Sequence, residues 1–344
     1  FPQYMNALRV PAPKALAEME MDAFALAPVG TGAFQIESWE EGQVTFNAFE
    51  NSWRAPQEDG LVITQLSDLS SRRQGVISGS LDVALGLAPE DATDIEAVGG
   101  RLWVRPEPSN NFLAFLTVRD SPLKDVRVRH ALNLAVNKER IIDAFLAGAT
   151  EPLGQMAHSM SFGFADDIEA YPYNPDLART LMAEAGYADG FDLPTSIVPG
   201  GTANSQDWYL QIAQDLAQIG VRMELRASTL PKYLEYMYNG GWPGLAFAMS
   251  SYTFDPIATY RSRSCSWTHP YHCDPTIMPL IEDAMAAETP EERQRLTKIV
   301  LRHEHEIPPG IFLWQGVSFE GLGPNVKAYW SGADTVRVEG IVIE

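Results

Sequence analysis

The first third of the chain is patterned mainly for β-strands. Apolar residues alternate with polar ones at 34–39 and again at 44–49, and an acidic turn separates the two runs. This spacing predicts a β-hairpin. A third apolar run at 61–63 leads to a polar helical segment at 67–78 and then to an apolar run at 81–87. Strand, helix and strand in this order predict the start of an α/β unit.

After Pro122 the spacing of apolar residues becomes helical. The apolar residues from Val128 to Leu146 share one face, which predicts a single long helix. Asn174 is a suitable capping residue, and Pro175 follows it at a position where proline is tolerated. Together they predict the first turn of a second helix.

The remaining patterns alternate between helix and strand. Residues 208–219 predict a helix, 221–226 a half-buried strand with a period of two, and 245–249 a buried strand. The sequence Thr-Pro-Glu-Glu at 289–292 forms a capping box that opens another helix, and the prolines at 308–309 end it. We therefore expect alternating α/β structure through the middle of the chain.

Strand patterns return after residue 310, so the chain is rich in strands at both ends. A chain that leaves one lobe and later returns crosses between lobes twice, which is the layout of a hinge. We expect the crossings near 110–112 and 312–317, with Trp314 close to a cleft between the lobes.

Length and charge narrow the class of protein. A chain of 344 residues is long for a single core and favours two lobes. Lys and Arg number 25 and Asp and Glu number 45, so the net charge is 25 − 45 = −20. An acidic field of this size repels phosphate backbones and anionic lipids, and a nucleic-acid partner is therefore not expected.

The two cysteines, Cys265 and Cys273, lie eight positions apart in a segment that is typical of a loop. An even number of closely spaced cysteines favours a disulfide, formed in an oxidising compartment. Zinc is the alternative, because His269 and His272 lie between the two thiols and complete a set of four ligands.

Motifs of enzyme chemistry are not found in the sequence. It contains no Gly-x-Ser-x-Gly elbow, phosphate-binding loop or His-Glu-x-x-His helix. His303 and His305 are two residues apart, which places them on opposite faces of a helix rather than on one metal ion. We expect a protein that is not an enzyme and that holds no cofactor and no metal.

Aromatic and polar residues instead gather in segments that are expected to be loops. One of these segments follows the buried strand at 245–249, at an edge of an α/β sheet where ligands often bind. Rings supply apolar contact and hydroxyl groups fix orientation in small-molecule pockets. For each ring, filling of the core is the alternative. The candidate ligand-binding residues are Asn111, Phe112, Gln155, His158, Phe162, Ser251, Tyr252, Phe254, Asp255 and Trp314.

Three strings of residues resemble one known family. The segment 28–34, PVGTGAF, is similar to a PVGTGPF turn, and 121–138, SPLKDVRVRHALNLAVNK, is similar to PLxDVRVRQALxYAVNK. The segment 173–186 is similar to YDPEKAKxLLxEAG. On these strings the chain resembles the family 5 extracytoplasmic solute-binding proteins, the peptide- and nickel-type binding subunits of ABC importers.

The resemblance implies an α/β, periplasmic-binding-protein-like fold with two lobes and a hinge, in the type II class of large peptide-binding proteins. Residues 1–113 are then the remainder of a first lobe, 114–316 a second α/β lobe, and 317–344 the return to the first. In the family the Gly-Thr-Gly turn comes late in the mature protein, whereas here it lies near residue 30. We therefore expect the first lobe to lack its amino-terminal portion and the chain to bind solute more weakly than a complete member of the family.

The resemblance also implies a periplasmic protein that captures a peptide or other small solute between its lobes and delivers it to a membrane permease. Family members often hold a peptide's amino group with an acidic residue where this chain has Tyr252, and 199–204 contains no basic residue for a carboxylate. A neutral or blocked solute is therefore favoured. The alternatives are a metal-dependent hydrolase that uses Cys265, His269, His272 and Cys273, and an interaction fragment that binds no solute.

Overall fold

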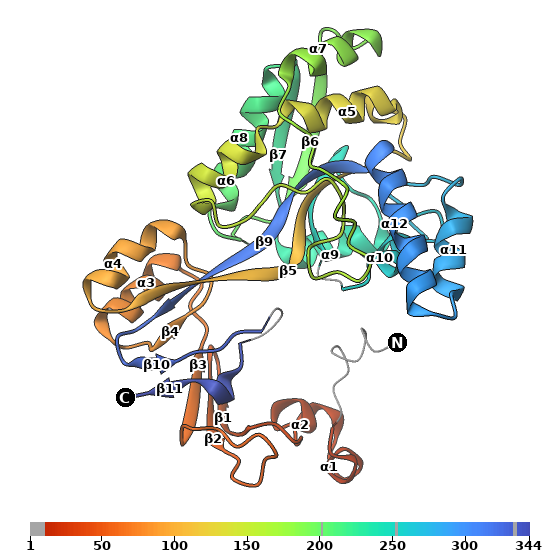
Figure 1. Cartoon of the computed structure of the whole chain (residues 1–344). Helices are drawn as coiled ribbons and strands as arrows, with labels where there is room; N and C mark the ends of the chain where they lie inside the picture. The colour runs from red at the N-terminus through yellow and green to blue at the C-terminus, as the bar shows by residue number, and fades with distance from the viewer. Residues whose placement is uncertain (1–10, 201, 252–253, 333–335) are drawn as a thin grey trace. The chain divides into compact units, whose positions relative to one another are not determined.

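The computed structural model describes residues 11–200, 202–251, 254–332 and 336–344. The chain divides into two compact units, which are Phe1–Arg105 with Ser318–Glu344 and Pro106–Val317. It passes from the first unit to the second within β5 (Arg101–Phe115) and returns within β9 (Gly310–Leu322) (Figure 1). The two changes of unit thus fall inside long strands rather than in flexible linkers.

The first unit contains a three-stranded antiparallel sheet. In it β1 pairs with β2, and β2 pairs with β3. Glu40 lies opposite Gln43 at the turn, which confirms the predicted hairpin. The apolar run at 81–87 contributes only a two-residue strand, β4, which pairs with the end of β9. The elements of this unit besides β5 and β9 are β1 (Phe34–Glu40), β2 (Gln43–Ala48), β3 (Gly60–Thr64), β4 (Val83–Ala84), β10 (Val326–Ala328), β11 (Val342–Ile343), α1 (Pro13–Glu18), α2 (Met21–Leu26), α3 (Leu69–Ser78) and α4 (Ala92–Ala97).

The second unit is built on a mixed sheet with the order β9-β5-β8-β6-β7. The added strands are β6 (Phe191–Ile197), β7 (Val221–Ala227) and β8 (Ala246–Ser251). β8 is antiparallel to β5 and parallel to β6, and β6 is parallel to β7. The strands predicted at 221–226 and 245–249 are therefore confirmed as β7 and β8.

Two groups of helices flank these strands (Figure 1). α5 packs against α7 and α8, while α10, α11 and α12 pack together. The helices of the second unit are α5 (Val126–Ala135), α6 (Lys138–Leu146), α7 (Pro175–Glu184), α8 (Ser205–Ala217), α9 (Leu230–Asn239), α10 (Pro256–Arg263), α11 (Met278–Ala286) and α12 (Pro290–Glu306). Both predicted caps are present: the backbone N–H of Leu177 donates to Asn174 Oδ1, and that of Glu292 donates to Thr289 Oγ1.

The single helix predicted from Val128 to Leu146 is wrong, because the chain forms two helices there. Val136 is extended, and Asn137 begins α6 by accepting a hydrogen bond from the backbone N–H of Arg140 at 3.1 Å. The backbone N–H of Asn137 donates to the buried carboxylate of Asp215 in α8 at 2.9 Å. This capping residue interrupts the helix while the apolar spacing continues across the break.

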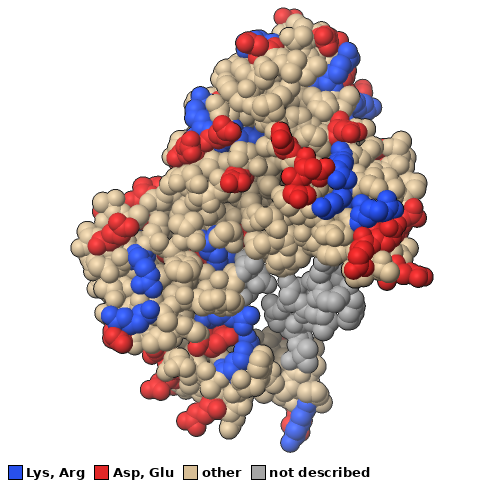
Figure 2. Space-filling model, in the orientation of Figure 1, with Lys and Arg blue, Asp and Glu red and all other residues tan. Residues whose placement is uncertain are grey.

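The surface carries both signs of charge. On the face drawn in Figure 2, Lys and Arg side chains stand in small groups beside Asp and Glu. No helix in the described part of the chain is long and apolar enough to cross a membrane.

One core of the second unit encloses a carboxylic acid. It contains side chains of β5, β8, α10, α11 and α12, among them Phe247, Tyr260, Ile281 and Val300. Glu304 of α12 is 6% exposed, and burial raises its pKa well above the usual value, although the neighbouring Tyr260 hydroxyl opposes that rise. A buried carboxyl without a cation favours the neutral form.

We expect the Glu304→Gln variant to gain stability over the wild type as the pH rises. The folded-state pKa of Glu304 lies above its unfolded value, so its contribution is complete at pH values below about 4.5 and is lost as the pH rises toward the folded pKa. Gln has nearly the same shape and does not titrate. Urea unfolding between about pH 4.5 and 8 measures the difference in unfolding free energy. A difference that stays constant across this range would contradict the prediction.

Candidate functional site

Two of the predicted residues lie where β8 ends. Asn111 of β5 is opposite Ser250 of β8, and the hydroxyl of Ser250 donates to Asn111 Oδ1 at 3.3 Å. Ser251 is the last residue of β8. Tyr252, the central residue of the predicted ligand loop, lies outside the described residues. The position of the strand end is thus defined, whereas the ligand contacts of Ser251 and Tyr252 stay predictions.

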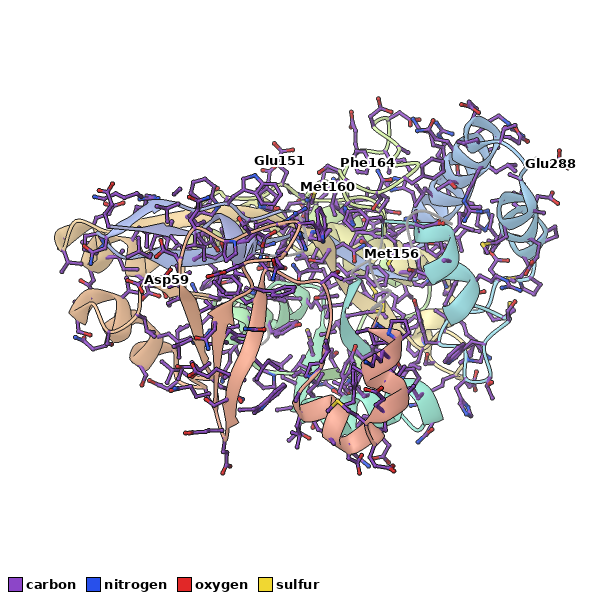
Figure 3. All side chains as sticks on the ribbon, turned by 90° about the horizontal axis from the view of Figure 1, so that it is seen from below. Asp59, Glu151, Met156, Met160, Phe164 and Glu288 are labelled. Carbon is purple, nitrogen blue, oxygen red and sulfur yellow. A yellow bond between two sulfur atoms is a disulfide. The ribbon has the colours of Figure 1, made fainter. Side chains whose placement is uncertain are left out.

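The long segment between α6 and α7 contributes three predicted residues. Gln155 is buried, and its amide binds the backbone of Ala165 twice, with Nε2 donating at 2.6 Å and Oε1 accepting at 3.1 Å. These bonds hold the segment in a closed loop. Met156, Met160 and Phe164, labelled in Figure 3, belong to the same loop.

Three predicted residues are brought together at this loop. The ring of His158 meets that of Phe254 edge-on, with centroids 5.8 Å apart. The backbone N–H of Phe162 donates to the carbonyl oxygen of Phe254 at 2.7 Å. His158 is buried, whereas Phe162 and Phe254 are half-buried. The loop and the segment that follows β8 therefore lie side by side.

Two predicted rings lie in the core of the second unit. Phe112 packs on Phe312 with centroids 5.3 Å apart, and Trp314 meets Trp208 edge-on at 5.1 Å. Phe112 and Trp314 are 2% and 1% exposed. Both rings are therefore packed in the core, which was the alternative considered for each predicted ring. Contact of either ring with ligand stays a prediction.

Asp255 is held by contacts within the fold. It caps α10 by accepting a hydrogen bond from the backbone N–H of Ile257 at 3.1 Å, and Arg293 Nη2 of α12 lies 2.5 Å from its Oδ2. The Asp255 side chain is 2% exposed and that of Arg293 is 18% exposed. The carboxylate thus joins the start of α10 to α12, a role that composition alone does not indicate.

A cavity of about 150 Å³ opens beside β8. Its lining comes from the end of α9, from the connection between α9 and β8, from β8 itself and from the loop between Cys265 and Cys273. The lining residues are Met237, Tyr238, Trp242, Phe247, Met249, Trp267, His269 and Tyr271. We call this cavity the aromatic pocket. It adjoins the predicted ligand segment, because Met249 immediately precedes Ser250.

The floor of the aromatic pocket is packed from buried rings and its rim is exposed. Trp242 stacks on Phe247 with centroids 4.0 Å apart, and Tyr271 meets Phe247 edge-on at 5.3 Å. Tyr238 at the rim is 60% exposed. Gly240 has φ +73°, and a Cβ there would lie 3.1 Å from the ring of His269, so glycine suits the position for both reasons.

None of the eight lining side chains carries a carboxylate, an ammonium or a guanidinium group. Rings and thioethers give apolar and polarisable contact, and the Tyr hydroxyls and the His269 imidazole supply a few hydrogen-bonding groups. This mixture is typical of sites that bind small molecules. The pocket can therefore hold an uncharged apolar or aromatic group.

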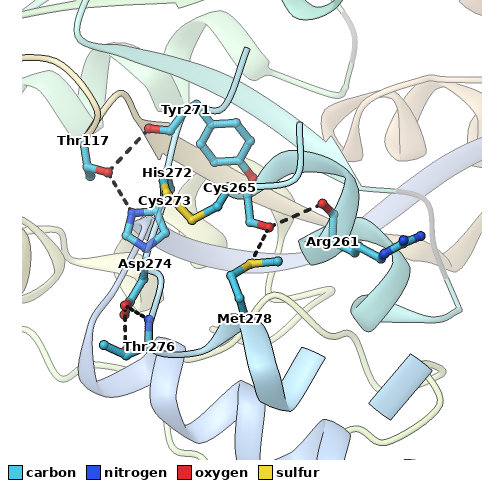
Figure 4. Close-up of a disulfide and its surroundings, with 10 residues drawn as sticks. Thr117, Arg261, Cys265, Tyr271, His272, Cys273, Asp274, Thr276 and Met278 are labelled. Carbon is cyan, nitrogen blue, oxygen red and sulfur yellow. Dashed lines mark hydrogen bonds between the residues drawn. A yellow bond between two sulfur atoms is a disulfide. The ribbon is translucent and has the colours of Figure 1, made fainter. Parts of the chain in front are cut away.

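Cys265 and Cys273 are joined by a disulfide, as predicted (Figure 4). The zinc-dependent alternative is wrong for these residues, because the two thiols are bonded to each other. His272 Nδ1 is 2.8 Å from Thr117 Oγ1, and burial lowers the pKa of His272 to about 4. His269 lies at the pocket instead. His303 and His305 have separate partners, Asp274 and the carbonyl of Gly154.

None of the eight residues of the aromatic pocket is among the ligand-binding residues predicted from the sequence. One signal was available, since rings occupy every second position of the loop, at 267, 269 and 271. The remaining lining residues come from α9, from β8 and from the connection between them, and only the fold brings them to the loop. A helix at 230–239 was not predicted, so its rings had no assigned place.

The role of Asp255 can be tested with Asp255→Asn. We expect this variant to lose about 3 kcal/mol of unfolding free energy, because it leaves the nearly buried Arg293 without its carboxylate while preserving the capping oxygen. Chemical denaturation measures the loss. Unchanged stability together with weakened solute binding would instead assign Asp255 to ligand contact.

Comparison with known proteins places these features in a family. The sequence profile of the bacterial extracellular solute-binding proteins, family 5, middle region, matches residues 1–268. The chain is 27% identical over 316 residues to the dipeptide-binding protein of Escherichia coli (strain K12), covering 88% of this chain and 59% of that protein. It is 28% identical to heme-binding protein A of Haemophilus influenzae, covering 88% of this chain and 57% of that protein. The chain thus spans less than two thirds of the length of these relatives.

Solved structures agree on the fold. The periplasmic binding protein DppA of Helicobacter pylori, in complex with the peptide STSA, superposes with a TM-score of 0.80 at 19% identity, covering 97% of this chain and 68% of that one. The substrate-binding protein CtaP of Listeria monocytogenes gives 0.83 at 19% identity, covering 97% and 71%. These similarities confirm the α/β fold of the type II periplasmic binding proteins, and with the match over 1–268 the chain belongs to family 5 of the bacterial extracellular solute-binding proteins.

Proposed function

We propose that this chain is the solute-binding subunit of an ABC importer and that the aromatic pocket receives an uncharged part of the solute. Membership of family 5 supports the class of function. Similar proteins are named for binding dipeptide, heme and glutathione. The single observation that carries the proposal within this chain is the cavity of about 150 Å³ beside β8.

The composition of the pocket favours a neutral solute. Its eight lining side chains include no carboxylate for a free amino group and no cation for a free carboxylate. Asp255, the nearest acidic residue in the sequence after β8, is engaged by Arg293 and by the cap of α10. We infer that the solute presents a hydrophobic or aromatic group to this unit and is a blocked peptide or a small non-peptide molecule.

The partner of the loaded protein is a membrane permease in this proposal. The chain passes between its two units twice, in β5 and in β9, so movement about these segments can report solute binding. A solute needs to favour one conformation by only a few kcal/mol to shift the population. Capture and release require no bond to be broken, and we propose no enzymatic step.

An extracytoplasmic location, the periplasm in a bacterium with two membranes, completes the proposal. Disulfides form and persist in oxidising compartments, and the only two cysteines of this chain are bonded to each other. The family is described as extracellular.

Solute capture can be tested on the 344-residue chain purified without denaturation. Native mass spectrometry is expected to detect a retained small molecule. Calorimetry with N-acetyl-Met-Leu amide and with free Met-Leu then compares a blocked dipeptide with a charged one. We expect the blocked form to bind at least as tightly. Tight binding of the free dipeptide alone contradicts the neutral class, and no retained molecule with no binding of either peptide contradicts solute capture.

Tyr238→Ala tests the pocket directly. Because Tyr238 is 60% exposed, we expect its loss to leave the unfolding midpoint nearly unchanged but to weaken binding of the retained solute or blocked dipeptide by about 1–3 kcal/mol. Tyr173→Ala is the matched control, since Tyr173 is another exposed tyrosine of the same unit and does not line the pocket. If Tyr238→Ala and Tyr173→Ala change the affinity equally, the aromatic pocket is not part of the binding site.

A further inference from the structure

The disulfide closes a loop that forms one wall of the aromatic pocket. Between Cys265 and Cys273, every second residue from Trp267 to Tyr271 lines the cavity. The loop therefore supplies three of the eight lining side chains, while the floor comes from β8 with Trp242 and the remaining lining from the end of α9.

The end of this loop and the chain following it are held by contacts that do not depend on the disulfide. His272 bonds to Thr117, and Asp274 accepts hydrogen bonds from the backbone and hydroxyl of Thr276 at 2.9 and 2.6 Å (Figure 4). Asp274 is also paired with His303 at 2.7 Å. Tyr271 lies beside this anchored stretch, and its ring is fixed against Phe247.

Trp267 and His269 are held differently. Within the described part of the chain, their side chains make no hydrogen bond, and the nearest backbone anchor is the N–H of Trp267, which donates to the carbonyl of Ser264 at 3.0 Å. Trp267 is half-buried and His269 is exposed. Closure of the loop by the disulfide therefore restricts the positions that these two side chains can take.

The disulfide is open to a reductant. Cys273 is exposed and Cys265 is half-buried. The chain contains no other cysteine, so a reductant has a single target and the thiols cannot exchange with a third. Exposed disulfides are more readily reduced than buried ones.

We propose that the Cys265–Cys273 disulfide acts as a redox-sensitive wall of the aromatic pocket, holding Trp267 and His269 in the positions that bind solute. This inference rests on the proposed solute-binding function and adds a regulation to it. A dithiol reductant supplies two electrons and two protons: the S–S bond breaks, two thiols form, and the reductant becomes a disulfide. The loop then loses its closure while Tyr271 and the floor stay in place.

The test uses the 344-residue chain and N-acetyl-phenylalanine amide, a neutral probe with one aromatic group. Its affinity is measured by calorimetry before and after reduction with dithiothreitol, with the freed thiols blocked by iodoacetamide. We expect reduction to weaken binding at least about tenfold. Near-ultraviolet circular dichroism checks that the second unit keeps its packing. The Cys265→Ser/Cys273→Ser chain is expected to bind like the reduced chain and to ignore dithiothreitol.

The Trp267→Ala variant distinguishes loss of the pocket wall from a general loss of stability. With the disulfide intact, this variant is expected to bind the probe as weakly as the reduced wild type and to show little further loss on reduction. Equal affinity of the oxidised and reduced chains overturns the inference, and so does unfolding of the second unit on reduction. If the Cys265→Ser/Cys273→Ser chain fails to fold, the affinities of the reduced, alkylated wild type and of Trp267→Ala still test the inference.

The two proposals fail in different ways. If native mass spectrometry finds a retained solute but the probe does not bind either redox form, the redox wall is overturned and solute capture stands. If no solute is retained and neither the probe nor the peptides bind, both proposals fall. Probe binding that weakens on reduction supports the redox wall whatever the retained solute is.

Discussion

Hydrogen bonding along both edges of β8 is the constraint on which the rest of the second unit depends. Residues 246–251 pair with β5 on one side, and Ala246 and Phe247 pair with β6 on the other. Since successive side chains in a strand point to opposite faces, this register turns Phe247 and Met249 together into the aromatic pocket. A slip of one residue would remove both from it and would displace the start of α10. The sheet thus fixes the floor of the pocket independently of solute.

Local signals predicted much of this fold because they act within a few residues. The hairpin of β1 and β2, the caps at Asn174 and Thr289, and the period of two in β7 all need only neighbours in sequence. The break between α5 and α6 was missed because the apolar spacing runs on across it. What decides the break is a bond from the backbone of Asn137 to Asp215, far along the chain.

Composition says less about the candidate site than about the fold, for a related reason. Asn111, His158, Phe162 and Phe254 lie around the end of β8 and the neighbouring loop. Phe112 and Trp314 were chosen for the same composition and lie in the core, and their contact with ligand stays a prediction. Whether a ring faces a cavity or a core depends on contacts between distant segments, and composition carries no information about them. The aromatic pocket is an assembly of this kind.

Residues 121–138, the string that best matches the family, form part of the scaffold rather than a binding site. Arg129 is buried and donates to the carbonyls of Leu123 and Pro308 at 2.9 and 2.7 Å. Lys138 donates to the carbonyl of Asn133 at 2.8 Å, and burial lowers its pKa to about 7. These side chains satisfy carbonyl oxygens around α5, so this string supports the architecture rather than a binding site.

The loop between Cys265 and Cys273 is a different kind of element. Its ends are covalently joined, and its lining positions alternate with positions outside the cavity. Substitutions at 267, 269 and 271 therefore alter one wall of the aromatic pocket without redesign of the sheet, which makes the loop an interchangeable module on a fixed framework.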